Sequence, residues 1–188
     1  FDTAMATASP SKLYYGLKEL STKADKQDDL LVQDFAMLET VDTDHIKEMT
    51  AAEKEVKLEY LHKWINQTLD TINGLDAEKY SGGIAYLLLS LIYRIDYLIT
   101  PEGKILNELE KIGGIYFRKD ERPVPEKNRD MAEEFRKMLA IPKEEVFKHL
   151  IRSTYTFSIV APQQYKTVAD SIHGANQNLV WYRDNNHP

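Results

Sequence analysis

An apolar segment at residues 84–99 constrains the fold most strongly. These 16 residues are interrupted only by Ser90, Arg94 and Asp96. A membrane-spanning helix needs about 20 apolar residues with few or no charges, so we expect no membrane insertion. A segment this apolar is instead typical of a helix buried in the core of a globular domain.

Capping residues and prolines mark the starts of the neighbouring helices. A Ser or Thr N-cap accepts a hydrogen bond from the first turn, and proline fits the first helical position. Glycine is typical just after a helix ends, as at Gly74. On these rules the sequence predicts helix starts at Ser9-Pro10, near Asp28, at Thr50 with Glu53, at Thr100-Pro101 and at Pro142.

After residue 112 the pattern changes, and the sequence predicts short strands. The pair Gly113-Gly114 is expected to end a helix. Residues 115–118, 154–160 and 178–183 are rich in β-branched and aromatic residues, which favours strands, and a helix is expected between the last two, from Pro162 to near Gly174. We therefore expect an α+β fold, mostly α: a helical bundle-like body at residues 1–112 and an α+β segment at residues 113–188. The segment carries a small C-terminal sheet of two or three short strands and packs on the body as one compact domain.

The charge is uneven along the chain. Residues 1–80 hold 16 acidic and 9 basic side chains, a net charge of -7, whereas residues 81–188 hold 14 and 15. Nucleic-acid binding needs a clustered basic surface, and we expect none. The one basic loop is diluted by acids; its basic residues are Arg118, Lys119, Arg122, Lys127 and Arg129.

Residue types absent from the chain exclude several chemistries. Cysteine does not occur, which excludes disulfides, a thiol nucleophile and Cys-ligated metals. The glycine pairs lack the spacing of phosphate-binding loops, and no serine has the flanking glycines of a hydrolase. We therefore expect no cofactor and no catalytic residue. The chain begins with Phe1, typical of a processed chain or a fragment, so the compartment stays open between cytoplasmic and exported after signal removal.

Glu59 and His62 form the one arrangement typical of a metal site. A Glu and a His three residues apart share a helix face, as in carboxylate-bridged di-metal bundles. Such bundles need two copies, and the sequence holds one. The favoured interpretation is that both side chains sit on the hydrated edge of an amphipathic helix, next to Lys57 and Lys63, so no metal site is predicted and Glu59 and His62 stay weak candidates.

A polar stripe along the apolar helix is the best ligand-binding candidate. Three tyrosines, a serine and an arginine recur at helical spacing, and Arg94 can grip a carboxylate or phosphate. The alternative is that the tyrosines pack and that Arg94 reaches solvent or pairs with an acid. The stripe consists of Tyr86, Ser90, Tyr93, Arg94 and Tyr97.

The leading prediction for function is a non-catalytic protein-interaction module, adaptor-like, chaperone-like or inhibitor-like. An acidic helical face would attract a partner with a basic surface, and exposed aromatics are typical of interface centres. The predicted contact residues are Asp28, Asp29, Asp34, Trp181 and Tyr182. The alternative is a small anionic-ligand-binding protein or enzyme with its site on the stripe. The sequence leaves the partner and the oligomeric state open.

Overall fold

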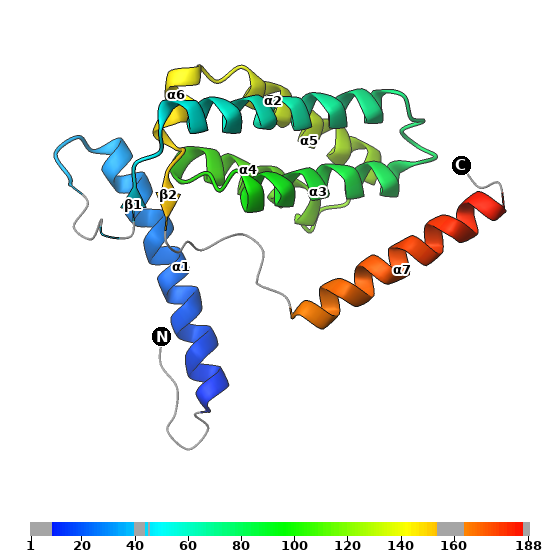
Figure 1. The fold of residues 1–188 in the computed structure, drawn as a ribbon, viewed down its shortest axis with the longest axis horizontal. Coiled ribbons are helices and arrows are strands. Elements are labelled where there is room, and N and C mark those ends of the chain that lie inside the picture. Colours follow the sequence, from blue (N-terminus) through cyan, green and yellow to red (C-terminus); the bar gives the residue numbers. More distant parts are fainter. Residues whose placement is uncertain (1–8, 40–43, 45, 154–163, 186–188) are drawn as a thin grey trace.

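The computed structural model describes residues 9–39, 44, 46–153 and 164–185 of the chain (Figure 1). Helices dominate this part. In order, its elements are α1 (Pro10–Asp34), β1 (Ile46–Lys47), α2 (Ala51–Asn73), α3 (Ser81–Leu98), α4 (Gly103–Phe117), α5 (Val124–Leu139), α6 (Lys143–Lys148), β2 (Arg152–Ser153) and α7 (Tyr165–Asp184).

A bundle of α2, α3, α4 and α5 forms the body, with α6 packed on α2. The predicted core helix is confirmed as α3, which packs against the other three long helices. Its Leu88 and Ile95 are fully buried, as is Phe135 on α5. Burial of such side chains contributes about 1.5–3 kcal/mol each, so the stability of the body resides here. The core also includes Leu61, Ile65, Ile92, Ile105, Leu109, Ile112 and Met131.

Several predicted helix ends are confirmed by the capping bonds. The Ser9 hydroxyl accepts a bond from the amide of Lys12 at 3.2 Å, with Pro10 as the first residue of α1. The Thr50 hydroxyl accepts one from Glu53 at 3.3 Å, and Gly74 caps the end of α2. These signals are local, so they act whatever the rest of the chain does.

Two other predicted helix starts are wrong. No new helix begins near Asp28, because α1 runs unbroken to Asp34. Thr100 does not cap α4: it adopts a left-handed backbone with φ of 50°, and α4 begins at Gly103. Between them the chain is extended, with Pro101 bridged to Leu150. Tertiary pairing therefore overrides the capping signal there.

The predicted C-terminal sheet, and with it the α+β fold class, is wrong: the described chain is a mostly helical fold. Residues 115–117 form the last turn of α4, in which Gly113 and Gly114 are both helical, so the boundary expected at residue 112 falls inside a helix. Residues 178–183 belong to α7, which runs on through Gly174. The third predicted strand, 154–160, lies outside the described residues. In the described residues, the strands β1 and β2 are two residues long each and pair antiparallel, with Ile46 opposite Ser153.

Two helices, α1 and α7, are not part of the four-helix bundle. Figure 1 shows α1 crossing one end of the body and α7 extending on its own. α1 packs on α4, yet both α1 and α7 lack any buried residue among those described. These two helices are 25 and 20 residues long, and among their described residues none is buried in the core of the bundle.

Candidate interaction surfaces

The predicted polar stripe lies on one exposed side of α3. Tyr86 and Tyr97 are 73% and 72% exposed. The guanidinium of Arg94 lies over the ring of Trp64 from α2, with its carbon 5.6 Å from the ring centroid. This contact between a cation and an aromatic face holds Arg94 against the protein. The five residues are thus brought together, Ser90 and Tyr93 included, and their role in ligand binding stays a prediction.

Glu59 and His62 lie one turn apart on α2, as predicted. Glu59 is exposed and His62 is half-buried. The Nε2 atom of His62 has no hydrogen-bond partner. Within the described ranges, no group of three or more His, Asp or Glu side chains is placed to hold a metal ion, so the pair gains no further ligand from the fold.

The predicted acidic contact residues lie in the second half of α1. Asp28 and Asp34 are exposed there. Asp29 belongs to the same helix, and its side chain is outside the part that the structure describes. The acids therefore accompany a helix that projects from the bundle and remain accessible to a partner.

The two predicted aromatic contact residues belong to a helix and not to a strand. Trp181 and Tyr182 lie in the last turn of α7, and their rings meet edge to face with centroids 5.3 Å apart. Each is about half exposed, at 53% and 50%. Neighbouring helix positions point about 100° apart, so these rings share one end of α7 and do not lie on opposite faces of a sheet.

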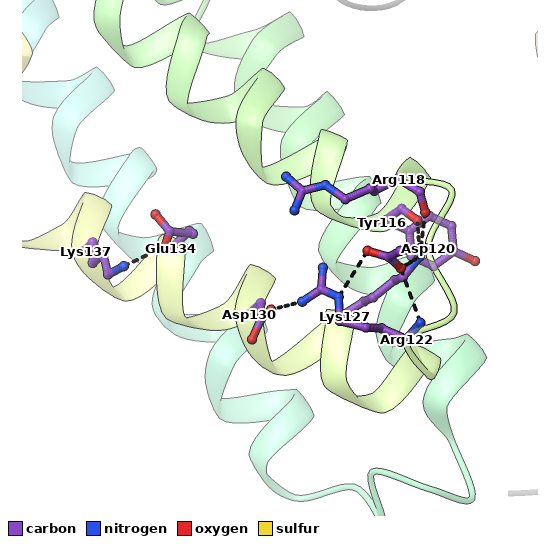
Figure 2. Close-up of polar contacts among 8 residues, drawn as sticks. All are labelled: Tyr116, Arg118, Asp120, Arg122, Lys127, Asp130, Glu134 and Lys137. Carbon is purple, nitrogen blue, oxygen red and sulfur yellow. Dashed lines mark hydrogen bonds and ion pairs between the residues drawn. The ribbon is translucent and has the colours of Figure 1, made fainter.

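The basic loop between α4 and α5 proves to be an ion-pair cluster, which the sequence reading missed (Figure 2). Lys127 is buried, and its Nζ lies 2.9 Å from Asp120 and donates to the carbonyl of Arg118 at 2.8 Å. Arg122 contacts Asp120 at 3.1 Å and Asp130 at 2.5 Å. The hydrogen bond from Lys127, helped by Arg122, lowers the pKa of Asp120 to about 2. Asp120 and Asp130 thus pair with two of the five basic residues, Arg122 and Lys127.

A cavity of about 550 Å³ opens between α4, α5 and α6. Its one buried ionisable group is His149, whose Nε2 lies 3.4 Å from a Glu145 oxygen. Burial is the main cause that lowers the pKa of His149, which keeps the imidazole neutral near pH 7. The rim carries equal numbers of Lys and Glu, so it offers no net charge to select a ligand; these are Lys104, Lys111, Lys137, Glu108, Glu134 and Glu145.

Apolar side chains exposed along α1 and α7 are a second feature that the sequence reading missed. On α1, Leu17 and Leu20 are 54% and 55% exposed, and on α7, Ile172 and Leu179 are 58% and 66% exposed. A helix partner covers such faces in most soluble proteins. In α7, the strand predicted at residues 178–183 hid the helical spacing of these apolar residues. In α1, the exposure of the leucines depends on how the rest of the fold packs, which the sequence does not show.

No family model, curated protein or solved structure matches this chain. Among the described helices, none combines the length and the hydropathy required to cross a membrane.

Proposed function

We propose that the chain is a non-catalytic protein-interaction module whose bundle presents α1 and α7 to other protein chains. The observation that carries the proposal is α7: a helix of 20 residues that buries none of them. In proteins, most of the stability of a helix comes from packing of its apolar face rather than from helix propensity. Covering its apolar face stabilises it by about 25 cal/mol for each Å² removed from water.

The spacing of the exposed residues on α7 fits recognition of another protein. Val168, Ile172, Ala175 and Leu179 recur at intervals of four, three and four residues, the anchor pattern of a helix laid in an apolar groove. Trp181 and Tyr182 stand at the end of the same helix, and these residue types dominate interface energies. A partner with an apolar groove therefore matches α7.

The acidic half of α1 supports a preference for a basic partner. Asp28 and Asp34 are exposed, and complementary charge raises the rate of encounter more than the final affinity. The complex should therefore form more slowly at high salt, as the charges are screened.

A capture experiment with the full chain tests this function. Immobilised wild-type chain and the variants Leu179→Glu and Gln177→Glu are incubated with native lysate, and bound proteins are quantified by mass spectrometry. Both variants add one negative charge to α7, but residue 177 lies on the helix side opposite the anchors, so we expect Gln177→Glu to retain a partner that Leu179→Glu loses. Equal capture by the two variants, or no partner at any ionic strength, contradicts the proposal.

The alternative function, an anionic ligand on the α3 stripe, gives a different result. Arg94→Ala leaves partner capture unchanged if α7 is the contact, whereas it abolishes binding of an anion held by the guanidinium.

A further inference from the structure

α1 carries the apolar spacing of a coiled-coil helix. Six positions alternate at intervals of four and three residues, the a and d positions of a heptad pattern. Five of the six are apolar, and the sixth is a glutamine. These seam positions are Leu13, Leu17, Leu20, Ala24, Gln27 and Leu31.

This seam points away from the protein's own body. Among its residues, Leu13, Leu17, Leu20, Ala24 and Leu31 are exposed. Of the half-buried residues, Lys18 and Thr22 lie on the opposite side of the helix, given about 100° per residue, whereas Asp25, Leu30 and Val32 lie on its two flanks and Gly16 lies nearer the seam. α1 packs on α4 while every seam residue stays exposed, so the seam is available to another chain.

The charges along α1 change sign near its middle. Residues 10–23 hold three lysines and one glutamate, whereas residues 24–34 hold four aspartates and one lysine. A parallel copy would place like halves side by side. An antiparallel copy places the basic half of each helix along the acidic half of the other, which is favourable.

We propose that two copies of the chain associate through α1, antiparallel across a two-fold axis. Leu13 of each copy then faces Leu31 of the other, and Leu20 faces Ala24. A two-fold contact of this kind is closed, so it yields a dimer and no larger assembly. This inference rests on the proposed function, since it names the partner of one of the two projecting helices.

Two residues of α1, the polar seam residue Gln27 and the charged residue Lys23, are compatible with the antiparallel dimer. Gln27 faces Leu17 of the second copy, and a single polar seam residue is a known means of fixing register. Lys23 of one chain lies near Lys23 of the second chain. Each of these charges is paired with Glu19 of its own helix, at 2.7 Å.

The other projecting helix is a poorer match for α1. α7 has similar spacing, but its charged residues, which are Lys166, Asp170, Arg183 and Asp184, show no change of sign along the helix. A second α1 is therefore the better complement. One helix pair involves fewer than the roughly 20–30 residues a side of a standard interface, so we expect a dissociation constant in the micromolar range.

Sedimentation equilibrium of the full chain, from about 1 to about 200 µM, tests the association. The wild-type chain should pass from monomer to dimer over this range. Leu17→Glu with Leu20→Glu should weaken the dimer at least tenfold. Tyr15→Glu, on the same helix but off the seam and 67% exposed, should not. Circular dichroism verifies that each variant retains its folded bundle.

Single cysteines test the orientation, because the chain has none of its own. In the antiparallel dimer, a mixture of Leu13→Cys and Leu31→Cys chains forms mixed disulfides on mild oxidation. Leu31→Cys alone does not, because residues 31 of the two copies lie about 27 Å apart along the helix axes, far beyond disulfide reach.

Three results would overturn the proposal. The first is a monomer at all concentrations, and the second is a dimer that the seam variants leave intact. The third is that Leu31→Cys alone forms disulfide-linked dimers while the mixture of Leu13→Cys and Leu31→Cys chains forms no mixed disulfides. None of these bears on α7. The proposed function is tested separately by the Leu179→Glu capture, so the two can fail independently.

Discussion

Replacing Lys127 by methionine should destabilise the bundle, because this buried lysine closes the junction between α4 and α5. Its Nζ donates to the carbonyls of Arg118 at 2.8 Å and Tyr116 at 3.4 Å and pairs with Asp120 at 2.9 Å (Figure 2). The last carbonyls of a helix lack partners within the helix. Lys127, from the next helix, supplies a hydrogen-bond donor to these carbonyls.

The magnitude follows from these bonds. Methionine keeps most of the apolar stem of Lys127, which is 7% exposed, but removes the three donors. A hydrogen bond from a charged donor contributes about 1.5–3 kcal/mol. Water can reach the loop and recover part of this loss, so the net cost should be about 2 kcal/mol. For a chain of this size that lowers the melting temperature by roughly 4–8 °C.

Urea unfolding followed by circular dichroism measures the effect. Lys119→Met is the matched control, since it removes the same charge from an exposed position in the loop between α4 and α5. It should change the free energy of unfolding by less than about 0.5 kcal/mol. If Lys127→Met is as mild as the control, the assignment of Lys127 as the cap of α4 is refuted.

Three further changes test the fold. Thr50→Ala removes the cap of α2 and should cost about 1 kcal/mol in urea unfolding; no loss would show that the 3.3 Å bond to Glu53 is not stabilising. Phe135→Ala empties a fully buried site and should cost about 3–5 kcal/mol; a cost under about 1 kcal/mol would contradict the core assignment. Burial lowers the pKa of His149, so the unfolded chain binds its proton more readily. The free energy of unfolding should therefore fall as pH falls below about 6.5 and level off below the folded pKa, and His149→Gln should remove this part of the pH dependence.

Local signals in the sequence predicted several helix ends correctly. The hydroxyls of Ser9 and Thr50 act on amides three residues away, so their effect needs no knowledge of the fold. The core helix followed from its apolar composition for the same reason. The prediction that Thr100 caps a helix was wrong because the bridge between Pro101 and Leu150 holds the chain extended just after it.

The strands were predicted wrongly because β propensity is weak against packing. Residues 115–117 continue α4 although two glycines precede them. A Cβ added at Gly113 would lie 3.6 Å from the Ile92 side chain of α3, an ordinary contact distance, and one at Gly114 would meet nothing within 4 Å. In residues 178–183, the content of β-branched and aromatic residues fits a strand, but the spacing of apolar residues from Val168 to Leu179 fits a helix.

The candidate site was only partly accessible to sequence reasoning. The stripe on α3 and the acids of α1 share one helix each, so their grouping could be predicted. The burial of Lys127 depends on the loop between α4 and α5 closing on itself, and charge alone does not reveal it. The exposure of the α1 seam depends on which side of the helix meets α4.

Hydrogen exchange of the full chain at two concentrations tests most directly whether α1 is completed by a second copy. At about 1 µM we expect the amides of α1 to exchange far faster than those of α3, since a helix without a covered face opens readily. At about 200 µM they should become protected, while the protection of α3 stays constant. Equal protection of α1 at both concentrations in the wild-type chain would contradict the account.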